Sequence, residues 1–217
     1  MEIREGLHLF LWNDPRQNNC NTYLLAGKKK ILIDPGHFAL FGNVVSQLEV
    51  LRINWEDMDM VISTHFHPDH MEAMSRFKGK RTIGSLFVLE YEFLKEITPG
   101  YGNPIDEIPC QILLKEGRLL VGDIELLILH TPGHSPGHMC LYWPKHKALF
   151  SGDLLFQGSV GRTDLLGGDP EELKRSLERL EDMDVEILLP GHGMPVIGKE
   201  KFIQNLKMVR ELFSMYL

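Results

Sequence analysis

The residues best suited to chemistry lie in one short stretch, residues 65–70, where three histidines and an aspartate share six consecutive positions. Imidazole nitrogen and carboxylate oxygen are ligand atoms that suit zinc, iron or manganese. Because side chains alternate along an extended segment, His65 and His67 point to one side and can bind one ion. The turn that follows lets Asp69 and His70 reach a second ion, as two-metal hydrolytic sites require. The alternative is a polar loop that happens to be rich in histidine, but the density of ligand types favours the metal site.

The ends of other predicted strands carry residues of the same kinds. Five apolar runs end in Asp34-Pro35-Gly36, in residues 65–70, in Gly133-His134, in Gly152-Asp153 and in Gly191-His192. In layered α/β proteins the carboxyl ends of neighbouring strands define the site, and glycine there lets the backbone approach a ligand closely. We therefore predict that these five endings line one cleft.

The strand endings supply enough ligands for two divalent ions. The predicted set is His65, His67 and His134 for the first ion, Asp69, His70 and His192 for the second, and Asp153 as the bridge between them. Three protein ligands and a bridge leave each ion an open position for water, which is typical of a catalytic metal site. Zinc is the expected metal, and iron and manganese suit the same ligands.

Composition and charge limit the class of protein. The chain has 217 residues, 43% of them hydrophobic, which is enough to build one globular domain over residues 1–217. The net charge of −7 argues against nucleic acid as a partner, because binding phosphates draws on clustered Lys and Arg. We expect a small-molecule substrate instead. The sequence leaves the oligomeric state open.

The sequence shows no signal peptide and no membrane span. The first 11 residues lack a basic start and a long apolar run, and no window approaches about 18 uninterrupted apolar residues. A cytoplasmic location is therefore expected. Cys20, Cys110 and Cys140 are odd in number and far apart, which predicts reduced, mostly buried thiols.

Hydrophobic periodicity and turn residues predict an alternation of strands and helices. Strands are predicted at residues 7–11, 22–25, 31–33, 60–63, 112–114, 118–121, 124–129, 140–143, 148–150 and 186–189. Helices are predicted at residues 40–53, 71–77, 85–97, 169–180 and from about Lys199. The three strands between residues 112 and 129 are expected to form antiparallel hairpins, and part of 85–97 is also compatible with a strand. Residues 98–109 are predicted to be irregular, either a lid or a plain surface loop.

The ligand motif and its order resemble the five-part signature of the metallo-β-lactamase superfamily. The resemblance runs from Asp34 to Gly193, through residues 65–70 and then His134, Asp153 and His192. It implies an α/β protein of the four-layer αββα type, with a binuclear metal site at one edge of two facing sheets. Residues 131–138 and 161–164 are most similar to the hydroxyacylglutathione hydrolase (glyoxalase II) group. That group has a longer helical C-terminal region that grips glutathione, whereas about one helix follows His192 here.

The resemblance implies a metal-dependent hydrolase whose activated water attacks a thioester, ester or lactone. Asp69 is the motif carboxylate expected to shuttle a proton as well as to bind metal. The first alternative is a persulfide dioxygenase, in which a single iron is held at the positions of His65, His134 and Asp153. A non-catalytic metal-binding protein is the second alternative.

A few other polar residues have two interpretations each. Arg162 can bind a substrate carboxylate through its planar guanidinium, or it can form a structural salt bridge with Asp164 or Asp169. Asp34 is expected to orient a ligand imidazole, although it can also be a turn residue. His138 is expected to support the His134 loop without binding metal.

Overall fold

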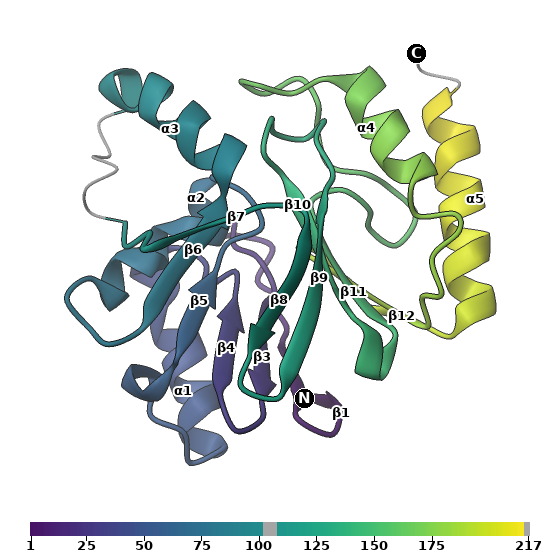
Figure 1. Ribbon diagram of the computed structural model, residues 1–217. Coiled ribbons are helices and arrows are strands. Elements are labelled where there is room, and N and C mark those ends of the chain that lie inside the picture. The colour runs from purple at the N-terminus through teal and green to yellow at the C-terminus, as the bar shows by residue number, and fades with distance from the viewer. Residues whose placement is uncertain (102–107, 215–217) are drawn as a thin grey trace.

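Two β-sheets pack face to face, and helices cover the outer face of each, so that the chain forms the predicted four-layer αββα sandwich (Figure 1). The computed structural model describes residues 1–101 and 108–214. α1 and α3 lie on one side of the two sheets, and α4 and α5 lie on the other (Figure 1).

The first sheet has seven strands in the order β1-β2-β3-β4-β5-β6-β7. Their bounds are β1 (Glu2–Arg4), β2 (Leu7–Phe10), β3 (Thr22–Ala26), β4 (Lys30–Ile33), β5 (Met60–Ile62), β6 (Ile83–Phe87) and β7 (Ile112–Leu114). Pairing is antiparallel from β1 to β4 and parallel from β4 to β7.

The second sheet has six strands in the order β13-β12-β11-β10-β9-β8. Their bounds are β8 (Gly117–Val121), β9 (Ile124–His130), β10 (Met139–Trp143), β11 (Ala148–Gly152), β12 (Ile187–Pro190) and β13 (Val196–Ile197). All its neighbours pair antiparallel except β11 and β12, which are parallel.

The helices come from amphipathic segments between the strands. They are α1 (Gly42–Val50), α2 (Pro68–Met71), α3 (Val88–Tyr101), α4 (Pro170–Glu178) and α5 (Lys199–Ser214), with short 3₁₀ helices η1 (Phe38–Leu40), η2 (Trp55–Asp57), η3 (Glu72–Phe77) and η5 (Pro144–His146). In the part of the chain that the structure describes, no helix combines the length and apolarity needed to cross a bilayer.

Alternating side chains along β9 show how one strand serves two cores. Ile124, Leu126 and Ile128 point into the apolar core between the sheets. Leu127 and Leu129 point the other way, into the core beneath α4 and α5. This period of two is what a strand buried on both faces requires.

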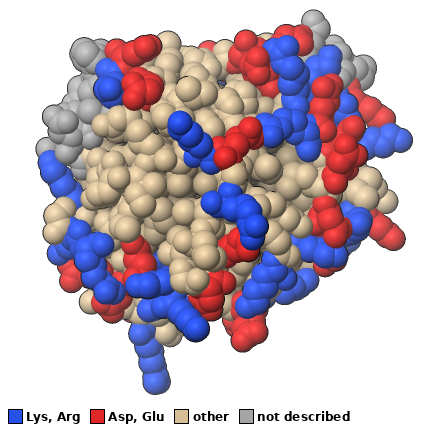
Figure 2. Space-filling view, in the orientation of Figure 1, with Lys and Arg blue, Asp and Glu red and all other residues tan. Residues whose placement is uncertain are grey.

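Among the described residues, most charged side chains lie at the surface. On the face in Figure 2, acidic and basic side chains are interspersed over α4 and α5, and a broad uncharged area lies to the left of the centre. All three cysteines are free thiols, and Cys20 and Cys140 are buried, as predicted.

Several predicted elements differ from the structure. The predicted helix over residues 85–97 begins only at Val88, because residues 83–87 add β6 to the first sheet. The helix then continues to Tyr101, so the first part of the predicted irregular segment 98–109 is helical. Most of the rest of that segment lies outside the described residues. The helix predicted at residues 71–77 begins earlier, at Pro68, and its second part is the 3₁₀ helix η3.

The prediction that β7 forms a hairpin with β8 was wrong. β7 pairs parallel with β6 in the first sheet, while β8 starts the second sheet and pairs with β9. The short apolar sequence of β7 does not reveal which of the two sheets the strand joins. At α4, Asp169 caps the helix, because its side chain accepts a hydrogen bond from the Glu172 N–H. The Asp169 N–H donates to the Gly133 carbonyl, and the Glu172 carboxylate pairs with Arg175.

A candidate metal centre

The candidate metal ligands and Asp34 lie in loops that follow strand ends. These loops follow β4 (Asp34), β5 (residues 63–70), β9 (His134), β11 (Asp153) and β12 (His192). Backbone hydrogen bonds join them: the Asp34 N–H donates to Ile62, and the Gly191 N–H donates to Gly152. The five predicted endings therefore meet at one edge of the two sheets.

The first group of candidate ligands is His65, His67 and His134. His134 Nε2 lies 3.2 Å from His65 Nε2 and 2.8 Å from His67 Nδ1. His65 and His134 are buried, and His67 is partly buried. Three imidazole nitrogens, from two loops that are distant in the chain, thus converge on one point.

The second group is Asp69, His70 and His192. His192 Nε2 lies 3.3 Å from His70 Nε2 and 3.3 Å from Asp69 Oδ2. Asp153 stands between the two groups, since its Oδ2 is 3.5 Å from His134 Nε2 and 3.4 Å from His192 Nε2. Its Oδ1 is 3.2 Å from His70 Nε2. The structure therefore places Asp153 where the sequence analysis expects a bridge.

The donor set fits a pair of divalent cations better than it fits hydrogen bonding. His134 Nε2 faces two other ring nitrogens, and one hydrogen atom cannot satisfy all three. Asp153 Oδ1 is buried and makes no hydrogen bond, although buried carboxylate oxygens ordinarily find a donor. A cation within each group would supply the missing partner for these lone pairs.

The electrostatics of the cluster favour a bound cation. Burial, together with the neighbouring His134, lowers the pKa of His67 to about 4, which leaves a neutral imidazole. Burial alone would raise the pKa of Asp153, but His70 and His192 hold it well below its usual range. Burial opposes the charged form of His192 too, yet hydrogen bonds with Asp153 and Asp69 raise its pKa to about 9. Two carboxylates thus attract positive charge to this spot.

Neighbouring groups fix the orientation of two histidines. The Nδ1–H of His70 donates to Asp34 Oδ2 over 3.0 Å, which leaves Nε2 directed at the cluster. Asp34 is buried and adopts a left-handed backbone conformation with a φ of 52°. His134 Nδ1–H donates to the Arg162 carbonyl over 2.7 Å, so its Nε2 also faces inward. Asp34 therefore orients a ligand candidate, as predicted.

Two predicted residues lie beside the cluster and not within it. The Arg162 guanidinium is exposed and forms a two-pronged ion pair with Asp164, at 2.9 Å and 2.8 Å. Of the two interpretations, the structure shows the salt bridge. His138 is buried, and its Nε2 accepts a hydrogen bond from the Asp153 N–H over 3.1 Å. It supports the Asp153 loop as well as the His134 loop.

Sequence reasoning missed three polar residues that hold the cluster. Asn18 Nδ2 donates to Asp69 Oδ2 over 2.9 Å, and Asn21 Nδ2 donates to the Pro190 and Gly193 carbonyls around His192. A run rich in amide side chains after a strand was a usable signal for both. Glu90 is fully buried on α3 and accepts hydrogen bonds from the loops on either side of it. No local pattern distinguishes it from the exposed acidic residues of the same helix.

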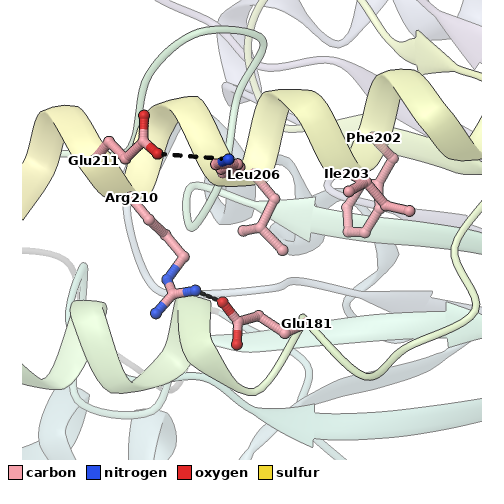
Figure 3. Close-up of a pocket in the computed structure, with 7 residues that line it drawn as sticks. Glu181, Phe202, Ile203, Leu206, Arg210 and Glu211 are labelled. Atoms are coloured by element: carbon pink, nitrogen blue, oxygen red, sulfur yellow. Dashed lines mark ion pairs between the residues drawn. The ribbon is translucent and has the colours of Figure 1, made fainter.

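Two hollows differ in their relation to the cluster. One lies beside His192 and is lined by the loop of residues 12–19. The other is a groove between α5 and the segment after α4, where Arg210 and Glu181 point toward each other (Figure 3). None of the candidate ligands lines this second groove.

Known proteins are similar to this chain in sequence and in fold. The metallo-β-lactamase superfamily matches residues 15–192. The hydroxyacylglutathione hydrolase GloC of Haemophilus influenzae is 36% identical over 85% of this chain and 90% of its own. The probable metallo-hydrolase MJ0888 of Methanocaldococcus jannaschii is 34% identical over 80% of this chain and 87% of its own.

Solved structures agree with these sequence matches. TTHA1623 in a di-iron-bound form has a TM-score of 0.69 and 34% identity, covering 88% of this chain and 94% of its own. The metallo-β-lactamase family protein TTHA1429 of Thermus thermophilus has a TM-score of 0.78 at 24% identity, covering 99% of this chain and 80% of its own, which shows the shared fold. With this fold, a His/Asp cluster at the sheet edge and a match over most of its length, the chain belongs to the metallo-β-lactamase superfamily of divalent-metal proteins and is related to its glyoxalase II-like hydrolases.

Proposed function

We propose that this protein is a binuclear metal-dependent hydrolase of a small-molecule thioester, with related esters and lactones as further substrates. One observation carries the proposal: two groups of three candidate ligands lie on either side of a single carboxylate, Asp153. His65, His67 and His134 would hold the first ion, and Asp69, His70 and His192 the second. When bound, two divalent cations supply a water that is acidic enough to ionise near neutral pH and positive charge to stabilise an acyl oxyanion.

The residues around the cluster would perform the remaining steps. Asp69 Oδ2 is already engaged by Asn18 and His192, so Oδ1 is the atom we assign to proton transfer. Burial raises the pKa of Asp69, but the hydrogen bond with His192 and the positive charges of His70 and His192 together outweigh this effect and hold the pKa well below its usual range. A carboxylate so firmly ionised is a weak proton donor, and a thiolate leaves without a proton whereas an amine does not. This argument favours thioesters over amides.

The substrate class receives support from the relative of H. influenzae, which is named for hydrolysis of hydroxyacylglutathione, a thioester. Arg162 is our candidate for a substrate-binding residue. Its carbonyl accepts from His134, so its exposed guanidinium stands on the segment that borders the cluster. We propose that a substrate carboxylate competes with Asp164 for this guanidinium.

Metal analysis and a substrate panel test the proposal. Protein purified from unsupplemented medium should contain two divalent ions per chain, with zinc the expected metal. The reconstituted protein should hydrolyse thioesters faster than esters, lactones or amides of matched acyl groups. One iron per chain with oxygen uptake on a persulfide would support the dioxygenase alternative, and full metal content without any turnover would support a non-catalytic protein.

One feature of the cluster favours the hydrolase over the dioxygenase. The mononuclear alternative needs only His65, His134 and Asp153. It leaves the close approach of His67 to His134, 2.8 Å, without a function. It also leaves the second group, which contains His192, without an ion to bind.

A further inference from the structure

Glu90 is a fully buried carboxylate at the start of α3. Its Oε1 accepts hydrogen bonds from the Phe66 N–H, over 2.8 Å, and from the Ser135 hydroxyl, over 2.6 Å. Its Oε2 accepts a third from the Gly137 N–H over 2.6 Å. Both carboxylate oxygens of Glu90 therefore have hydrogen-bond donors.

The three donors belong to the two loops of the first ion group. Phe66 stands between His65 and His67, and Ser135 directly follows His134. One carboxylate thus ties together the two chain segments whose imidazole nitrogens must meet at about 3 Å. Gly137 permits the contact, because a Cβ there would lie 2.0 Å from the Glu90 backbone nitrogen.

The second ion group is held by different residues. Asp34 orients His70, Asn18 holds Asp69, and Asn21 binds the backbone on both sides of His192. The hydrogen bonds that the Glu90 carboxylate makes within residues 1–101 and 108–214 go to the loops of the first group. A change at Glu90 should therefore act on one ion and spare the other.

Stability alone gives a weak reason for a carboxylate at this position. Burying a charge costs free energy that its hydrogen bonds roughly offset, so the carboxylate adds little net stability, although its loss would leave three buried donors unpaired. The buried residue one turn further along α3, Leu94, is apolar. What a carboxylate adds is a fixed spacing between two loops, because three bonds of defined direction meet on one rigid group.

We propose that Glu90 is a positioning residue that sets the geometry of the first ion site by fixing the His65–His67 loop against the His134 loop. This inference rests on the proposed function, because it takes the three histidines to be ligands. It predicts that Glu90 controls the affinity of the first ion selectively.

The test is a metal titration of full-length variants against a chromophoric chelator, with Zn²⁺ for affinity and Co²⁺ for its ligand-field spectrum. Glu90→Gln keeps the volume but sets an amide NH₂ against a backbone N–H. We expect its first-ion Kd to rise about 10–100-fold, as for other partners of ligand residues, while the second Kd stays within about threefold. The Co²⁺ band of the first site should shift. His67→Ala and His192→Ala identify which titration step and band belong to each ion.

Glu92→Gln is the matched control, because Glu92 is an exposed residue of the same helix that pairs with Lys95. It should leave both Kd values and the spectrum unchanged. Ser135→Ala is the milder variant: it removes one hydrogen bond to Glu90 and should weaken the first ion about fivefold. It keeps the test decisive if Glu90→Gln does not fold.

Two results would overturn the inference. In one, folded Glu90→Gln or Ser135→Ala protein binds the first ion with wild-type affinity. In the other, both ions weaken equally, which indicates general loosening of the fold. Failure of the proposed function looks different, because the wild-type protein itself would then bind fewer than two ions or hydrolyse nothing in the panel.

Discussion

Substitutions of Asp34 distinguish its contribution to the stability of the fold from its contribution to metal affinity. The buried Asp34 carboxylate accepts three hydrogen bonds: from the Thr64 N–H at 2.7 Å, the Thr64 hydroxyl at 2.9 Å and His70 Nδ1–H at 3.0 Å. Its left-handed φ of 52° is one that asparagine also adopts readily. Asp34→Asn therefore changes the hydrogen-bond pattern with little effect on the backbone.

The amide can keep its oxygen on the Thr64 N–H, but its NH₂ group then faces His70 Nδ1. The amide NH₂ can donate a hydrogen bond to His70 Nδ1 only if the His70 proton moves to Nε2, the atom that lies 3.3 Å from His192 Nε2. That proton occupies the lone pair a cation would use. We expect the second ion to bind about 10–100-fold more weakly, or about 1.4–2.7 kcal/mol, while the metal-free fold loses only about 1–2 kcal/mol.

Asp34→Ala gives the contrasting result. It leaves three buried donors unpaired, at about 1–3 kcal/mol each, and a total loss of about 3–9 kcal/mol is expected. Urea unfolding of the metal-free variants measures the stability, and chelator competition measures the metal affinity. Wild-type affinity for both ions in Asp34→Asn would show that this carboxylate does not set the His70 tautomer. A loss below about 1 kcal/mol in Asp34→Ala would contradict the burial argument.

Four further predictions concern the cluster and its support. His67→Ala should abolish turnover and remove one ion while far-ultraviolet circular dichroism stays unchanged. Gly133→Ala should cost about 2–4 kcal/mol in urea unfolding, because the residue has a φ of 128° and its Cβ would lie 2.2 Å from the Leu173 nitrogen. Chelator treatment should lower the Tm, and added metal should restore it, since the ions bind only the folded state. Metal-free protein should lose stability as pH falls from about 6.5 to about 4, because His67 titrates near 4 when folded and near 6.5 when unfolded.

Each of these has a result that would count against it. Activity retained in His67→Ala with one ion lost favours a mononuclear mechanism. The pH effect is isolated by comparing wild type with His67→Ala, whose stability should fall less steeply, by up to about 1.4 kcal/mol per pH unit. If stability falls with pH equally steeply in wild type and in His67→Ala, His67 is not held neutral by burial. A Gly133→Ala variant as stable as wild type would mean that α4 can move aside, and a Tm that ignores chelator would mean that the folded protein holds no ion.

The candidate ligands could be selected from the sequence because metal chemistry restricts residue types. His65, His67, Asp69 and His70 are close in the chain: alternation directs His65 and His67 to one side, and the turn that follows carries Asp69 and His70. His134, Asp153 and His192 are distant from one another, but each follows an apolar run and a glycine. The structure brings all seven together at the sheet edge. The two-sheet arrangement came from the resemblance alone, since a strand sequence does not state its sheet.

The hairpin error at β7 has the same origin. Residues 112–114 and 118–121 are short apolar runs separated by a glycine, which is the ordinary signature of a hairpin. Their assignment to different sheets depends on long-range pairing of β7 with β6. The predicted start of the helix at residue 85 was wrong for a related reason. β6 and α3 share an apolar stretch in which strand and helix periods overlap, and the helix begins at Val88.

The residues that position the candidate ligands are the part of the site that is hardest to predict from sequence. A ligand is constrained by the ion and must be one of a few residue types, whereas a positioning residue needs only an acceptor at the right place. Glu90 meets Phe66 and Ser135, which are 24 and 45 residues away in the chain, through bonds that no periodicity encodes. Relatives that keep the same histidines can therefore differ in how tightly they hold each ion. The affinity of this protein for its first ion should therefore depend on a buried partner such as Glu90 as well as on the three histidines.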